Sequence, residues 1–162
     1  MFAVYFAGPD VFLPNYAHIR DKIVALGDRN SLTPLLPGDA VLNSSEEIFR
    51  HNLHLIKEAQ AVVANLNPFR SPVEPDSGTV YECAYAFALG KPVFGFLTGE
   101  GDLKSRLRLA GISIDADGLC PGGWKVEDFG QPLNLMLAHG LTSLSSTLEE
   151  AASRAAEYLH SR

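Results

Sequence analysis

Residues 61–97 read AVVANLNPFRSPVEPDSGTVYECAYAFALGKPVFGFL and hold two apolar runs separated by a helical pattern. Residues 61–66 form a nearly continuous apolar segment, which is typical of a strand covered on both faces. Residues 78–89 fit a helix that stops at Gly90, and residues 92–97 fit the next strand. A strand, a helix and a second strand in this order predict a right-handed crossover between parallel strands.

The same alternation continues on both sides of this stretch. Strands are predicted at 2–6, 31–36 and 140–144, and helices at 19–26, 44–59, 133–138 and 145–159. This order predicts an α/β fold, a flavodoxin-like three-layer sandwich with a five-stranded parallel sheet. We expect a single domain over residues 1–162, with a surface excursion at about 98–130. Chemistry is expected after the first, third and fourth strands, because ligands of such sheets bind beyond the carboxyl ends of the strands.

The composition favours an uncharged small molecule as the ligand. The 162 residues are 46% hydrophobic, enough for one sizeable core, and carry a formal net charge of -6. Such a surface cannot neutralise a nucleic-acid backbone, and it repels a highly phosphorylated ligand. We therefore expect no polymeric nucleic acid as a partner.

The cysteines and the N-terminal residues favour a cytoplasmic protein. Cys83 and Cys120 show no CxxC spacing and no disulfide framework, so we expect both to be reduced. Residues 1–6 are apolar but lack the basic segment that begins a signal peptide. No segment approaches the length of a membrane span, so we expect no membrane partner.

The segment after the first predicted strand could form one wall of a ligand site. It reads YFAGPDVF from Tyr5 to Phe12. The turn at Gly8 and Pro9 would let a ligand approach the backbone, and Phe12 would be either a wall of the site or a core residue. The segment matches neither a GxGxxG fingerprint nor a Walker loop, which argues against a dinucleotide or a nucleoside triphosphate.

A proline-rich loop and a helix follow the third predicted strand and carry two carboxylates. Asp76 is a natural N-cap for this helix. Glu82 lies six residues further on among small and apolar neighbours, either as a solvated helix position or as a carboxylate directed into a pocket at the strand ends. The pair would suit glycosidic chemistry, in which one carboxylate attacks the anomeric carbon and the other helps the leaving group to take a proton.

Four segments together resemble the nucleoside 2-deoxyribosyltransferase family. They are YFAGP at 5–9, ANLNPFR at 64–70, EPDSGTVYE at 74–82 and PLNLM at 132–136. The resemblance covers nearly the whole chain. Its most specific part is the Asp-Ser-Gly-Thr-x-x-Glu segment, followed later in the chain by Asn-Leu-Met.

The resemblance implies a transfer of 2-deoxyribose between nucleobases by double displacement. Glu82 would be the nucleophile that forms a covalent deoxyribosyl ester, Tyr5 would orient it, and Asp76 would contact the base and assist its protonation. Asn134 would reach from one subunit to the 5'-hydroxyl of the sugar bound in a neighbouring subunit, and Met136 would lie beside it. The partners would be deoxynucleosides, free nucleobases and a second copy of the chain, in a homodimer or a dimer-based hexamer, with no cofactor or metal.

The chain departs from the family at two places that bear on base preference. Asn52 stands at a substrate-binding position where some members have Asp. Residues 70–73 read RSPV where other members have a shorter Arg-Gly form. The sequence therefore does not decide whether the protein accepts only purine bases or pyrimidine bases as well.

Two other functions compete with transfer. A hydrolase of the same fold would share Glu82 but use water as the acceptor. A non-catalytic nucleotide-binding module would have the same sheet, but a phosphoacceptor receiver would need an acidic cluster after the first strand, where Asp10 stands alone. An Asp would also end its third strand, where this chain has Asn65.

Two further clusters are given structural roles. His51 and His54 lie three residues apart on a predicted helix, but no third convergent ligand is evident, so we expect a solvated helix face and no metal site. Lys104, Arg106 and Arg108 form a short basic run, which we interpret as a surface feature rather than a phosphate clamp.

Overall fold

A computed structural model describes all residues 1–162 and contains one five-stranded sheet in the order β2-β1-β3-β4-β5. All neighbouring strands pair in parallel. The strands are β1 (Phe2–Ala7), β2 (Leu32–Leu35), β3 (Ala61–Asn65), β4 (Val93–Phe96) and β5 (Ser143–Ser145). The predicted flavodoxin-like α/β fold with a five-stranded parallel sheet is confirmed.

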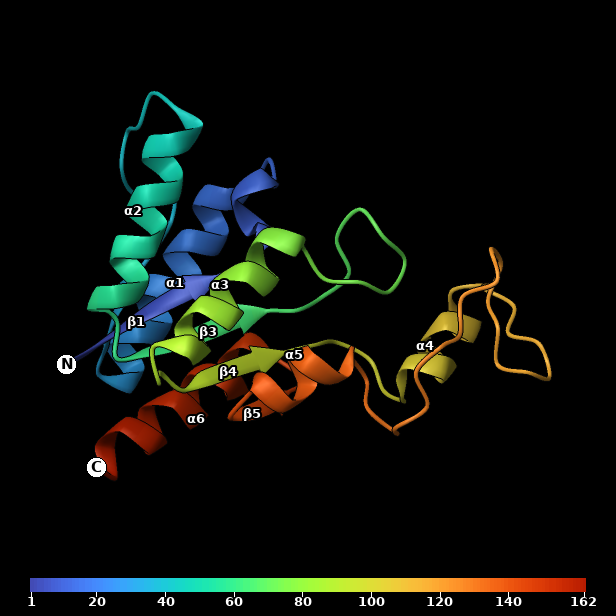
Figure 1. Ribbon diagram of the computed structural model, residues 1–162. Helices are drawn as coiled ribbons and strands as arrows, with labels where there is room; N and C mark the ends of the chain where they lie inside the picture. The colour runs from blue at the N-terminus through green and yellow to red at the C-terminus, as the bar shows by residue number, and fades with distance from the viewer.

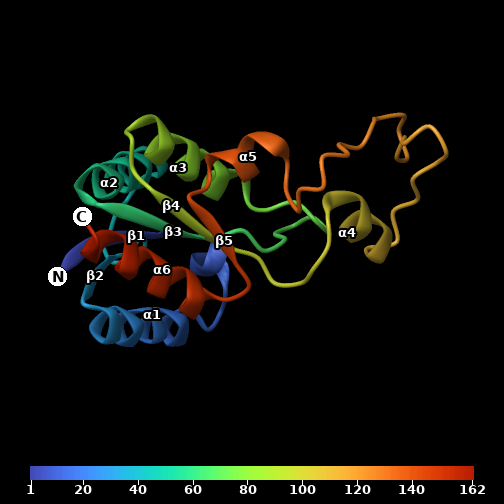
Figure 2. The ribbon, with the colours of Figure 1, turned by 90° about the horizontal axis from the view of Figure 1, so that it is seen from below.

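Helices cover both faces of the sheet, as Figures 1 and 2 show. One face packs against α1 (Tyr16–Asn30) and α6 (Leu148–His160), and the other against α2 (Ser45–Glu58), α3 (Ser77–Ala88) and α5 (Leu135–Gly140). Successive side chains of a strand point to opposite faces, so Val4 and Phe6 join the first core and Tyr5 joins the second. This alternation directs Tyr5 toward the side that carries α2 and α3.

The ends of several elements differ from the sequence prediction. Asp76 caps α3 as predicted, and the helix begins at Ser77 rather than at 78; Asn134 caps α5, which begins at Leu135 rather than at 133. Helix α5 runs to Gly140, and β5 covers Ser143–Ser145 instead of 140–144, just before Thr147 caps α6. A short 3-10 helix, η1 (Pro9–Phe12), precedes α1, which begins at Tyr16 instead of at 19.

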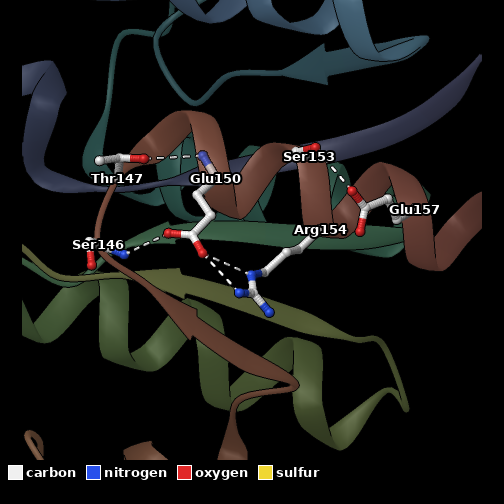
Figure 3. A network of polar contacts seen from close by, with 6 residues as sticks. All are labelled: Ser146, Thr147, Glu150, Ser153, Arg154 and Glu157. Atoms are coloured by element: carbon white, nitrogen blue, oxygen red, sulfur yellow. Dashed lines mark hydrogen bonds and ion pairs between the residues drawn. The ribbon is translucent and has the colours of Figure 1, made fainter.

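Helix α6 is the amphipathic cover of the sheet that its sequence predicts. Four alanines on one face are buried in the core: Ala151, Ala152, Ala155 and Ala156. On the other face Glu150 accepts hydrogen bonds from the backbone of Ser146 and from Arg154, while Thr147 caps the helix (Figure 3). The polar contacts of α6 therefore stabilise the helix itself, and they lie on its exposed side.

The segment after β4 extends away from the sheet before it returns at α5 (Figure 2). It contains α4 (Leu103–Leu109) and one isolated bridge between Leu119 and Lys125. The interpretation of Arg106 as a surface feature is wrong, because its side chain is buried and donates to Pro132 O over 2.5 Å and to Val73 O over 3.2 Å. The exact extent of the excursion and the division into domains stay predictions.

None of the helices combines the length and the apolar character that crossing a membrane requires.

Candidate active site

Three elements bring Glu82 into one polar cluster. Helix α3 begins at the carboxyl end of β3 and carries Glu82 in its second turn, beside α2 and the central strand β1. Glu82 Oε1 accepts a hydrogen bond from Tyr5 Oη over 2.7 Å and another from Asn52 Nδ2 over 3.3 Å. The structure therefore brings together three of the residues that the sequence singled out.

The environment of Glu82 favours its neutral form. Burial raises the pKa of Glu82 to about 7, against the hydrogen bonds from Tyr5 and Asn52, and the nearby charge of Asp76 adds to the rise. Burial also raises the pKa of Tyr5 far above its usual value, with Glu82 contributing, so Tyr5 stays a hydrogen-bond donor. The carboxylate is thus poised to change protonation near neutral pH, as acid–base and nucleophilic groups do.

Glu82 faces a cavity between α2 and α3. The cavity has a volume of about 370 Å³, and its lining residues are Phe49, Asn52, Leu53, Ser77, Gly78, Tyr81 and Glu82. Asn52 Oδ1 is buried here and has no hydrogen-bond partner in the protein. The cavity is therefore lined by the Glu82 carboxylate, and Glu82 is not a fully solvated helix position.

Asp76 has the capping role that its position predicts. Its Oδ2 accepts hydrogen bonds from Thr79 N over 2.8 Å and from Thr79 Oγ1 over 3.1 Å. A Cβ on Gly78 would lie 2.9 Å from the same oxygen, which explains the glycine in the Asp-Ser-Gly-Thr segment. Asp76 Oδ1 takes no hydrogen bond from the protein. Its contact with a nucleobase stays a prediction.

The turn after β1 is closely packed against the end of β3. A Cβ on Gly8 would lie 2.5 Å from Asp10 Oδ2 and 2.9 Å from Asn65 Cβ, so glycine is required there. Asn65 Nδ2 donates to both carboxylate oxygens of Asp10, and Asn65 Oδ1 accepts from Asn67 Nδ2. The contact between Asn65 and Asp10 was not predicted from the sequence. Its only indication there is that Asn65 is a polar residue at the end of a buried strand.

Phe12 is not a core residue, so that alternative is wrong. Its side chain is 60% exposed and stacks on Phe69, with ring centroids 5.5 Å apart. The guanidinium of Arg70 lies over both rings. Pro9, in η1, is buried. A role for Gly8, Pro9 or Phe12 in substrate binding stays a prediction.

Asn134 and Met136 are not brought to Glu82 within one chain. They line a second cavity, of about 560 Å³, between α3 and α5, together with Val80, Ala84 and Phe87 on a different face of α3. Asn134 Oδ1 accepts from Met136 N over 3.0 Å, and Asn134 Nδ2 donates to Glu127 Oε1 over 2.5 Å. Glu127 could not be identified from the sequence, because its partner Asn134 lies seven residues away across an irregular segment.

Cys83 is next to Glu82 in sequence but has a different environment. It is buried, and burial raises the pKa of its thiol to about 12, so it stays protonated. His51 is partly buried and His54 is exposed. No group of three or more His, Cys, Asp or Glu side chains is arranged to hold a metal ion.

Comparisons with known proteins show the family of the chain. A family model described as nucleoside 2-deoxyribosyltransferase matches residues 4–136. A solved 2-desoxiribosyltransferase from Leishmania mexicana is 35% identical, with a TM-score of 0.82, over 98% of this chain and 99% of that one. No curated protein sequence matches the chain.

Two more distant structures share the fold. A 2-deoxyribosyltransferase from Bacillus psychrosaccharolyticus is 19% identical, with a TM-score of 0.57, and the match covers 93% of this chain and 90% of that one. A CMP N-glycosidase from Clostridium botulinum is 13% identical, with a TM-score of 0.51, over 96% and 99% of the two chains.

Proposed function

Because the chain belongs to the nucleoside 2-deoxyribosyltransferase family, we propose that it transfers 2-deoxyribose between nucleobases with Glu82 as the nucleophile. The observation that carries the proposal is the position of Glu82, partly buried at a cavity and held by Tyr5 and Asn52. The substrates are small deoxynucleosides and free nucleobases, which suit a protein with a formal net charge of -6.

In the first half-reaction the free oxygen of Glu82 attacks C1' of the donor nucleoside. The bond between C1' and the base nitrogen breaks, its electron pair stays on the base, and the base takes up a proton from the solvent, to which the acceptor base returns one in the second half-reaction. The product is a deoxyribosyl ester of Glu82. Since Oε1 is occupied by two donors and Oε2 by none, Oε2 is the oxygen available for attack.

In the second half-reaction a nitrogen of another base attacks C1' from the vacated face. The ester bond breaks, its electron pair returns to Glu82 as the carboxylate, and the acceptor base loses its proton. Two displacements restore the original configuration at C1'. A substrate without a 2'-hydroxyl destabilises the developing oxocarbenium less, so a carboxylate suffices without a metal.

Tyr5 and Asn52 hold the nucleophile in place. Both donate to the same oxygen, which fixes the carboxylate plane and lowers the pKa of Glu82 against the effect of burial. Asn52 also lines the cavity that Glu82 faces. Removing either donor is expected to raise the pKa of Glu82, so that a smaller fraction of Glu82 is ionised at neutral pH.

Asp76 assists the leaving base. Its Oδ2 is committed to the cap of α3, and its Oδ1 is free to hydrogen bond to a protonated base nitrogen. Its charge also adds to the rise in the pKa of Glu82.

A second copy of the chain completes the site. Asn134 and Met136 are exposed and line the cavity between α3 and α5 rather than the Glu82 cavity, and Met136 is 76% exposed. They are available to contact the sugar bound by a neighbouring subunit, in a homodimer or a dimer-based hexamer. Closing the site in this way also excludes water, which would otherwise compete with the acceptor base.

Incubation of a deoxynucleoside with a different free base tests this function. A new deoxynucleoside, seen by chromatography, is the expected product, and Glu82→Gln should not form it. Free deoxyribose alone would show that the chain is a hydrolase. A small set of purine and pyrimidine donors and acceptors would define the base preference in the same experiment.

A further inference from the structure

An aromatic pair stands at the cavity that Glu82 faces. Phe49 on α2 and Tyr81 on α3 both line this cavity, with ring centroids 6.0 Å apart and ring planes tilted by 54°. The two residues are 48% and 53% exposed. Because the rings are not stacked face to face, neither ring covers a face of the other.

The substrate chemistry limits what can lie against these rings. During attack, C1' lies at bonding distance from Glu82, and the base is attached directly to C1', so the base lies in or at the mouth of this cavity. The deoxyribose carries hydroxyl groups, whereas a nucleobase has a flat π face. Stacking of a base on an aromatic side chain is favourable and tolerates different bases.

The polar lining of the cavity lies on the same side. Asn52 lines the cavity beside Glu82, and its Nδ2 donates to Glu82 Oε1 over 3.3 Å. An edge directed at Asn52 would leave a face of the base for the aromatic rings, since Phe49 is one helical turn from Asn52.

We propose that Phe49 and Tyr81 are specificity-determining residues that bind the face of the nucleobase at the mouth of the Glu82 cavity. The proposal rests on the proposed function, because Glu82 defines where the base must lie. Stacking area grows with ring size, so the pair favours purines over pyrimidines.

Alanine and conservative variants of the two residues test the proposal. In Phe49→Ala and Tyr81→Ala we expect KM for the acceptor base to rise roughly tenfold. The rise should be larger for a purine than for a pyrimidine, with kcat and the unfolding temperature little changed. Phe49→Tyr and Tyr81→Phe keep the rings and should behave like the wild type. Phe129→Ala, at another exposed aromatic residue on the segment after β4, is the matched control.

Calorimetry separates this proposal from the proposed function. Binding of a free purine base is measured in Glu82→Gln, with and without Phe49→Ala, so the result does not depend on turnover. Base binding that weakens with Phe49→Ala supports the aromatic pair even if the wild type performs no transfer. Unchanged base affinity and unchanged KM in both alanine variants would overturn the proposal. Dissociation of the oligomer in these variants would also overturn it, because Phe49 and Tyr81 would then form a contact between subunits.

Discussion

Tyr5 Oη donates a hydrogen bond to Glu82 Oε1 over 2.7 Å, across 77 positions of sequence. The alternation of side chains along β1 turns Tyr5 toward the α2–α3 side, and burial keeps its hydroxyl protonated. A buried strand residue thereby controls the ionisation of a carboxylate on a helix. The first prediction tests this control.

Tyr5→Phe removes the donor and keeps the ring. The hydrogen bond from Tyr5 lowers the pKa of Glu82, so its loss should move the pKa that governs kcat/KM above about 7. The nucleophile must be ionised, and therefore activity near pH 6 should fall roughly tenfold more than activity near pH 8.5. A pH profile of kcat/KM measures this, with Tyr158→Phe on α6 as the control. An equal loss at all pH values would show that Tyr5 does not tune Glu82.

Glu82→Gln should change the pH dependence of stability. The pKa of Glu82 is raised from 4.5 to about 7 by folding, so its contribution to stability is fully present below about pH 4.5 and is lost as the pH rises through 7. The glutamine does not titrate. The variant should therefore gain stability relative to the wild type between about pH 5 and pH 8, by at most about 3 kcal/mol. Urea unfolding at the two pH values measures the difference, and no change between them would contradict the pKa.

Mixing two inactive variants tests the shared site. Glu82→Gln lacks the nucleophile and Asn134→Ala lacks the proposed contact from the neighbouring subunit. If the sites are shared, a hybrid dimer contains one site without either substitution, so exchange of subunits should restore about a quarter of wild-type activity. Assays before and after subunit exchange measure this, with light scattering to establish the oligomer. No recovery in a proven hybrid would place Asn134 outside the partner's site.

Arg106→Met should destabilise the fold. The buried guanidinium binds the backbone carbonyls of Val73 and Pro132, and thus joins α4 to the segments that lead to α3 and α5. Loss of these donors should lower the free energy of unfolding by about 2 kcal/mol. Chemical denaturation measures this. The exposed Arg108→Met should change it by less than about 0.5 kcal/mol, and an equal effect of both would contradict the role of Arg106.

The sequence predicted the sheet and the helices because their signals are local. Residues 61–66 are apolar enough to indicate a buried strand, and Gly90 marks the end of the next helix. Element ends were less predictable, because they depend on which side chain forms the cap, as Asn134 does for α5. The burial of Arg106 could not be predicted, since its partners lie 26 and 33 residues away.

Some residues of the candidate site could likewise be found from the sequence, and others could not. Glu82 and Asp76 stand in one short segment whose spacing resembles a family motif, so they could be found from sequence. Phe49 and Tyr81 come from two different helices, and their pairing depends on how α2 packs against α3. The contact between Asn65 and Asp10 likewise needs β1 and β3 side by side.

Mass spectrometry of the protein with a deoxynucleoside donor and no acceptor base tests whether Glu82 is the nucleophile. After rapid quenching and proteolysis, we expect one deoxyribosyl adduct, on the peptide that contains Glu82, and this adduct should disappear when a second base is added before quenching. Transfer activity without any adduct, or with an adduct on another residue, would contradict Glu82 as the nucleophile.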